Sequence, residues 1–225
     1  ESPAKLGKFI YSHKVTNRHQ EKDIRVNLFI PSILSWKEEG VELIQQSRIP
    51  ESEQVDLILN LKKKQKLILR IRKPDWTDKA TFIINGEEEQ PLLGSDGYWI
   101  IDRVWERKNV ITLRLPMHIY TENLTGTDRY VALLYGPYVL AGRMGKENLP
   151  TTFWGKMNNT AMNKMDMAKV PVFREPVERI PTHVEVVSGE PLKFGINLKG
   201  FEHIVLEPFY KVHFERYAVY WPITH

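Results

Sequence analysis

The stretch VDLILNLKKKQKLILRIR, residues 55–72, decides the fold class of this chain. Within it, residues 55–61 place Val and Leu at every second position, and residues 67–72 do the same with Leu and Ile. A period of two residues is typical of a β-strand with one buried face. The run of three lysines at residues 62–64 is typical of a solvated turn. We therefore predict two strands joined as an antiparallel hairpin.

Further short β-prone runs bounded by turn residues lie on both sides of this stretch. Asn85-Gly86 favours a type I′ turn, and Asp96-Gly97 is a second turn signal. Residues 110–115 alternate in the same way as residues 55–61. Closely spaced short strands predict an all-β fold, an antiparallel β-sandwich or a jelly roll.

The N-terminal residues carry a different, helical pattern. Apolar and aromatic side chains three and four residues apart predict a short amphipathic helix over residues 2–13, with Ser2 as N-cap and Pro3 in the first turn. The side chains of this stripe are Leu6, Phe9, Ile10 and His13. We expect residues 1–23 to be a helix and linker that remain from a preceding domain.

The distribution of Met and Asn divides the rest of the chain. Five of the six methionines lie in residues 144–179, a stretch with little alternation. We therefore expect a β-sandwich over residues 24–143, an irregular linker over 144–179 and an additional C-terminal β element over 180–225. This element either docks on the first sandwich or completes a second sheet with residues 130–141.

Composition excludes several classes of function. The 225 residues carry a net charge of only +4 and no charge block beyond the lysine turn, so we expect no nucleic-acid partner. No apolar run approaches the roughly 20 residues that span a bilayer. Zero cysteines exclude a thiolate nucleophile, a Cys-rich zinc site and disulfides in this chain. Because the chain starts at Glu1, we expect a processed product or a fragment.

Chemistry-bearing motifs are scarce. The seven histidines are scattered without metal-ligand spacing, so no metal ligand is assigned. Paired carboxylates drive most glycoside hydrolysis, and Asp75 and Asp102 lie near tryptophans. Acidic residues in such positions are ordinarily solvated turn residues, and we assign no catalytic residue.

Tryptophan is the remaining candidate for binding. Trp99 and Trp221 lie inside apolar runs and are expected in the core. A ring exposed at the surface stacks on sugars, so a carbohydrate-binding platform is an alternative to core packing for the others. Its candidate residues are Trp36, Trp76, Trp105 and Trp154.

Several strings occur in the order found in a known family. VNLFIPS (26–32), LRIRKPDW (69–76) and VALLYGP (131–137) resemble the C-terminal half of bacterial β-L-arabinofuranosidases of glycoside hydrolase family 127 (formerly domain of unknown function 1680). PFYKVH (208–213) and YAVYW (217–221) resemble an extension found in many members from Bacteroidetes.

The resemblance implies a catalytic (α/α)6 barrel outside this chain. KLGKFIY (5–11) resembles the helix that follows the cysteine motif of that barrel. In the family a cysteine nucleophile is held on zinc by further cysteines and a glutamate. We therefore expect no cofactor in this chain, and zinc in the missing catalytic domain.

Three functions follow as hypotheses. The first is a non-catalytic accessory region that supports the barrel of a plant-glycan hydrolase or forms a homodimer. The second is a carbohydrate-binding module for arabinose-containing glycans. The third is a freestanding carboxylate enzyme using Asp75 and Asp102. A periplasmic or secreted location is expected if the parent is a Bacteroidetes glycan-degrading enzyme.

Overall fold

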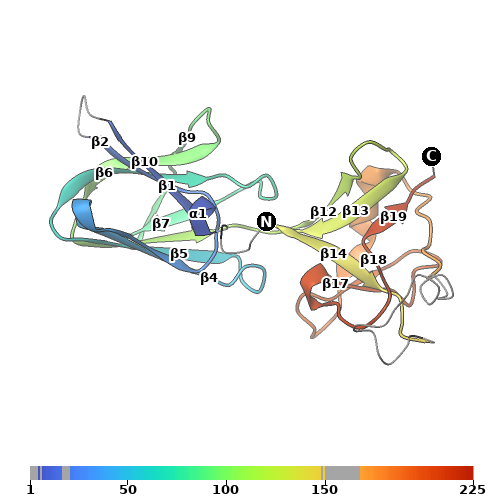
Figure 1. Cartoon of the computed structure of the whole chain (residues 1–225). Coiled ribbons are helices and arrows are strands. Elements are labelled where there is room, and N and C mark those ends of the chain that lie inside the picture. The colour runs from blue at the N-terminus through green and yellow to red at the C-terminus, as the bar shows by residue number, and fades with distance from the viewer. Residues whose placement is uncertain (1–4, 6, 17–20, 148, 150–167, 225) are drawn as a thin grey trace. The chain divides into compact units, whose positions relative to one another are not determined.

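The computed structural model describes residues 5, 7–16, 21–147, 149 and 168–224 of the chain. They divide into two compact units, Glu1–Met117 and His118–His225. Figure 1 shows strands throughout both units, and the longest described α-helix has four residues. The all-β prediction is confirmed. Each unit has its own cluster of buried apolar side chains.

The first unit is a sandwich of two sheets. Sheet A has the order β1-β2-β6-β10-β9, and sheet B has the order β3-β4-β5-β11-β7-β8. Neighbouring strands are antiparallel except for the parallel pair β2–β6. The bounds in sheet A are β1 Tyr11–Thr16, β2 Glu21–Val26, β6 Gln65–Arg72, β9 Leu92–Leu93 and β10 Tyr98–Trp105. Those in sheet B are β3 Ser32–Trp36, β4 Val41–Ser47, β5 Gln54–Leu61, β7 Thr81–Ile84, β8 Glu87–Glu89 and β11 Lys108–Arg114.

The inner faces of sheets A and B meet in one core. The alternating positions of β5 and β6 that point inward are all fully buried. Phe82 of sheet B lies edge-on against Trp99 of sheet A, with ring centroids 5.1 Å apart. Burial of these apolar faces stabilises the sandwich, since each large side chain removed from water contributes about 1.5–3 kcal/mol.

The predicted hairpin at the lysine turn is wrong. Both strands exist near their predicted bounds, but β5 pairs with β4 and β11 in sheet B, whereas β6 pairs with β2 and β10 in sheet A. The turn of residues 62–64 therefore carries the chain from one sheet to the other. By contrast, the predicted turn at Asn85-Gly86 is confirmed, because both residues have positive φ and join β7 to β8.

The N-terminal prediction needs correction. Helix α1 covers only Gly7–Ile10, and the chain is extended from Tyr11 onward, where β1 pairs with β2. Ile10 is buried but Phe9 is largely exposed. Ser2, Pro3 and Leu6 lie outside the described residues. Strand pairing replaces the helical pattern, so residues 11–16 and 21–23 are part of the sandwich and not a separate linker.

The second unit is built on sheet C. Its path is β12-β13-β14-β17-β16-β15, with β18 paired to β14 and β19 paired to β13. Its bounds are β12 Ile119–Asn123, β13 Tyr130–Tyr135, β14 Tyr138–Arg143, β15 Val184–Val186, β16 Phe194–Ile196, β17 Val205–Pro208, β18 Tyr217–Ala218 and β19 Tyr220–Pro222. One face of sheet C packs on Phe173, Phe201 and Trp221, whose rings contact one another.

The domain boundary expected near Arg143 is corrected to the step between Met117 and His118. Strands β12 to β14 pair with the C-terminal strands β17, β18 and β19, and so belong to the second unit. The C-terminal β element thus completes a second sheet with residues 130–141, which is one of the two arrangements considered from the sequence. Of residues 144–179, the structure describes 144–147, 149 and 168–179.

Gly142 of β14 gives a test of the second core. A Cβ at Gly142 would lie 2.5 Å from the ring of the fully buried Trp221, whereas a Cβ at Gly195 of β16 meets nothing within 4 Å. We expect Gly142→Ala to lower the free energy of unfolding by about 1–3 kcal/mol through overpacking. Gly195→Ala is the matched control and should change it by less than about 0.5 kcal/mol. Urea unfolding of both variants measures this, and equal effects would contradict the packing.

Candidate functional site

The outer faces of the sheets are where this chain can meet a partner. Among the described residues, no three His, Asp or Glu side chains gather in a way that could hold a metal ion. Asp75 is exposed in a loop, and Asp102 forms an exposed ion pair with Lys66. Asp102 lies opposite Ile68 in the middle of β6, whereas Asp75 follows the end of that strand, so the register keeps these two carboxylates apart. No helix within the described ranges is long and apolar enough to cross a membrane.

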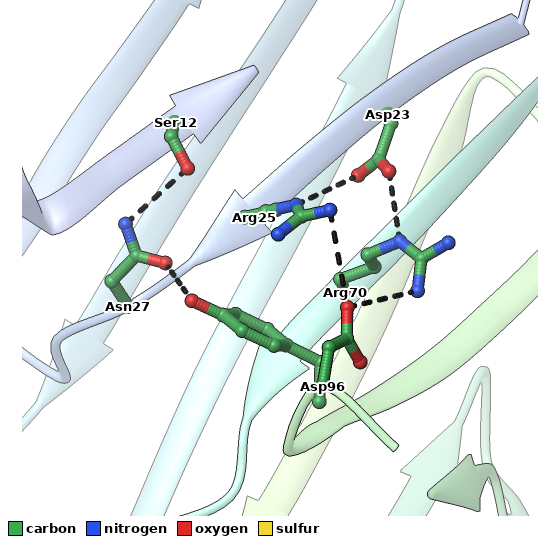
Figure 2. Close-up of polar contacts among 7 residues, drawn as sticks. Ser12, Asp23, Arg25, Asn27, Arg70 and Asp96 are labelled. Carbon is green, nitrogen blue, oxygen red and sulfur yellow. Dashed lines mark hydrogen bonds and ion pairs between the residues drawn. The ribbon is translucent and has the colours of Figure 1, made fainter. Parts of the chain in front are cut away.

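A charged network covers part of the outer face of sheet A (Figure 2). Asp23 of β2 is nearly buried and accepts a hydrogen bond from Nε of Arg70 at 2.8 Å. Arg70 also lies 3.5 Å from Asp96, in the turn before β10. Arg25 lies 3.9 Å from both carboxylates. We call Asp23, Arg25, Arg70 and Asp96 the charged network.

Neutral side chains extend the charged network toward β1. The Arg25 guanidinium lies 5.3 Å from the centre of the Tyr98 ring, within the range of a cation–π contact. The Tyr98 hydroxyl donates to Asn27 Oδ1 at 2.8 Å, and Asn27 in turn donates to the Phe9 carbonyl and to Ser12. The network therefore ties three strands and the N-terminal segment together. The charges of the network pair with one another, although the buried Asp23 Oδ1 accepts no hydrogen bond within the described residues.

The outer face of sheet B has the opposite character. Ile33, Ile44, Ile58 and Val110 are successive register partners across β3, β4, β5 and β11. All four point away from the core, since their chain neighbours Leu34, Leu43, Leu57 and Ile111 pack inside. Ile33 is 64% exposed and Val110 is 45% exposed. We call these four residues the apolar ladder.

A hollow of about 600 Å³ continues the apolar ladder toward β7. It is lined by Ile58, Ile83 and Val110 together with polar residues such as Asn60 and Lys108. Contiguous exposed apolar surface with a polar rim is characteristic of contact sites between proteins or domains. Sheet B thus offers a docking face, whereas the outer face of sheet A combines the exposed side chains of Leu92 and Val104 with the charged network.

The tryptophans proposed as a sugar platform are scattered. Trp105 is only 1% exposed and its Nε1 donates to the Leu67 carbonyl, so its assignment as a platform residue is corrected to the core. Trp76 is partly buried against the same core. Trp36 is mostly buried but lines a hollow of about 390 Å³ beside His13, whose ring centre lies 4.6 Å away. Trp154 lies outside the described residues. Trp99 and Trp221 are buried, as expected.

Sequence reasoning missed both the apolar ladder and the charged network. The signal for the ladder was present, because Ile44 and Ile58 occupy the positions of their strands where polar residues are expected. The pairing that lines them up was not visible without the register. Asp96 was noted only as part of a turn signal, and its role beside Arg70 depends on the tertiary structure.

Two family models together match most of the chain. Residues 23–117 match the model described as "Beta-L-arabinofuranosidase, GH127 middle domain". Residues 120–223 match a domain of unknown function, DUF4986. The two matches agree with the two compact units. No curated protein matches the chain.

Solved structures share the fold. A GH127 β-L-arabinofuranosidase from Geobacillus stearothermophilus superposes with a TM-score of 0.64 at 17% identity, over 98% of this chain and 36% of that one. A protein described as a glycoside hydrolase gives 0.58 at 18% identity, over 90% of this chain and 36% of its own. A GH127 β-arabinofuranosidase gives 0.58 at 15% identity, over 91% and 35%. This chain therefore spans about a third of the length of these proteins.

The charged network can be tested by neutralising its nearly buried carboxylate. Asp23→Asn removes the charge of the group that accepts the Arg70 Nε hydrogen bond and leaves Arg70 only its longer contact with Asp96, so we expect the free energy of unfolding to fall by about 1–3 kcal/mol. Asp102→Asn removes an exposed carboxylate from the same sheet and should cost less than about 0.5 kcal/mol. Chemical denaturation of both variants provides the comparison. A cost for Asp23→Asn no larger than that for Asp102→Asn would show that the network does not stabilise the sheet.

Proposed function

We propose that this chain, whose residues 23–117 belong to the glycoside hydrolase family 127 middle-domain family, is a non-catalytic accessory region of a larger glycoside hydrolase. In this role the first unit supports a catalytic barrel and docks on it through the apolar ladder. The family match is the observation that carries the proposal. The lengths of the similar structures support it, because each has about two thirds of its chain outside the matched region.

The contrast between the two outer faces supports the choice of docking surface. Covering the apolar ladder is favourable by roughly 25 cal/mol for each Å² of apolar surface removed from water. Covering the charged network would instead require the removal of water from four charges. Sheet B is therefore the favoured contact of the first unit, with Asn60 and Lys108 at the rim of the hollow.

The catalytic chemistry is proposed to lie outside this chain. The chain contains no cysteine, whereas the family resemblance implies a cysteine nucleophile and a zinc ion in the barrel. We propose an arabinofuranosidase-like parent that acts on plant-type glycans outside the cytoplasm. The support for this substrate class is the description of the matching family and of the solved relatives.

The purified chain should not hydrolyse glycosides. We expect no release of nitrophenol from α- or β-L-arabinofuranosides or from a panel of other nitrophenyl glycosides, with or without added zinc. Circular dichroism showing a folded β protein serves as the control. Turnover above background that Asp75→Asn or Asp102→Asn abolishes would overturn the proposal in favour of a freestanding carboxylate enzyme.

The apolar ladder should make the isolated chain associate. We expect light scattering to show concentration-dependent oligomers, because the ladder has no partner to cover it. The double variant Ile33→Lys/Val110→Lys should shift the chain toward monomers, whereas Leu92→Lys on β9 should not, although Leu92 is 74% exposed. A chain that is monomeric before substitution, or that responds equally to Leu92→Lys, would contradict docking through the ladder.

A further inference from the structure

The outer face of sheet C carries rings and charges side by side. Register pairing places Glu207 opposite Ala141 and Tyr217 opposite Arg143, so these side chains share one face of the sheet. The other face is the core, because Leu140 and Leu206 pack inward with Trp221. Part of the outer face is covered, since Ala141 is fully buried, but Arg143 and Tyr217 reach the surface at its edge. The outer face belongs to a unit that matches a domain of unknown function.

Two aromatic rings form an exposed pair on this face. Phe209 follows β17 and lies 4.9 Å from Tyr217 between ring centres. Phe209 is 43% exposed and Tyr217 is 50% exposed. Exposed rings present electron-rich faces to which polarised C–H groups are attracted. The ring planes are tilted by 52°, so one ring can stack on a ligand with C–H groups on one side while the other contacts the edge of that ligand.

A polar hollow of about 300 Å³ lies on the same face. Its lining includes Arg143, Lys193, His203 and Glu215. Arg143 Nε donates to Glu215 Oε1 at 2.5 Å, and its Nη1 lies 3.3 Å from Glu207 Oε2. The hollow joins the aromatic pair through Arg143, the register partner of Tyr217, and through Glu215, two residues before it.

The ions of this hollow are held in fixed positions. The Glu215 and Glu207 side chains are only 5% and 9% exposed. Lys193 lies 3.9 Å from Glu207, and its hydrogen bond to Glu190 raises the pKa of its ammonium group, which stays charged at neutral pH. The backbone also fixes the site, because the Met144 N–H donates to the Arg216 carbonyl and the Arg216 N–H donates to the Gly145 carbonyl. The hydrogen-bond donors and acceptors of the hollow are therefore already in place before a ligand binds.

We propose that the aromatic pair and the polar hollow form a binding site for a neutral sugar ring. The apolar side of the sugar ring stacks on one ring of the Phe209–Tyr217 pair and its edge contacts the other, and its hydroxyl groups exchange hydrogen bonds with Arg143 and Glu215. A volume near 300 Å³ is at the lower end for small-molecule sites and fits one sugar unit, such as the end of a glycan chain.

The charges of the hollow disfavour an anionic ligand. The three carboxylates Glu190, Glu207 and Glu215 outnumber the two cations Arg143 and Lys193, so a phosphate or a nucleic-acid backbone would meet acidic groups beside each cation. A neutral polyol uses both kinds of group, since each hydroxyl donates one hydrogen bond and accepts others. The site differs from the tryptophan platform considered from the sequence, and it does not depend on the docking role of the first unit.

Isothermal titration of the full chain tests the site. Linear arabinan, arabinogalactan and xylan, and the free pentoses L-arabinose and D-xylose, are titrated separately into the protein. We expect saturable binding of at least one of them and a loss of roughly tenfold in affinity for Tyr217→Ala and for Phe209→Ala. Both side chains are about half exposed, so these variants should stay folded. Circular dichroism confirms this.

Two controls locate the binding. Tyr130→Ala removes a 41% exposed ring at the start of β13, and Trp76→Ala removes a ring from the first unit; neither should weaken binding. No heat with any of the sugars would overturn the proposal. So would a loss of affinity that follows Trp76→Ala or Tyr130→Ala rather than Tyr217→Ala. Self-association abolished by Tyr217→Ala without sugar binding would instead identify the face as a contact between copies of the chain.

Discussion

The structure of the first unit depends on the burial of β5 against β6 across the sandwich. Val55, Leu57 and Leu59 on one strand and the matching positions of the other are completely removed from water. Strand alternation then fixes the orientation of the remaining side chains of these strands, since a side chain that does not face the core must face outward. Core packing therefore determines which residues lie on the outer faces, and these residues are the ones that can contact a partner.

The outer faces differ in the partner that they accept. Sheet A covers itself with paired charges anchored by Asp23 and Arg70, whereas sheet B leaves Ile33 and Val110 exposed in a row. Sheet C of the second unit combines the rings of Phe209 and Tyr217 with fixed ions. We propose an apolar partner for sheet B and a sugar ring for sheet C.

Local features of the fold could be predicted from the sequence, and pairing could not. Alternation located β5 and β6, and Asn85-Gly86 located a turn, because both signals involve neighbouring residues. Alternation looks the same for two strands that pair in a sheet and for two that face each other across a core, which is why the hairpin was wrong. The helical spacing near Phe9 was overridden by pairing of Tyr11 with Val26. The boundary was misplaced because β14 pairs not only with the neighbouring β13 but also with β17 and β18, more than 60 residues away.

The candidate sites were harder to predict for the same reason. Trp105 lies an even number of residues from Trp99 and Ile101 on the same strand, a spacing that indicates the same inward face for its side chain. The apolar ladder exists only once four strands are in register.

The central claim, docking through that ladder, can be measured directly because the chain lacks cysteine. Single variants Ile33→Cys and Leu92→Cys would be labelled with a thiol reagent, in the chain alone and in the chain joined to its parent's catalytic barrel, with peptide mass spectrometry identifying each site. The account predicts that the barrel protects Cys at position 33 but not at position 92; equal labelling of both positions in both proteins would contradict it.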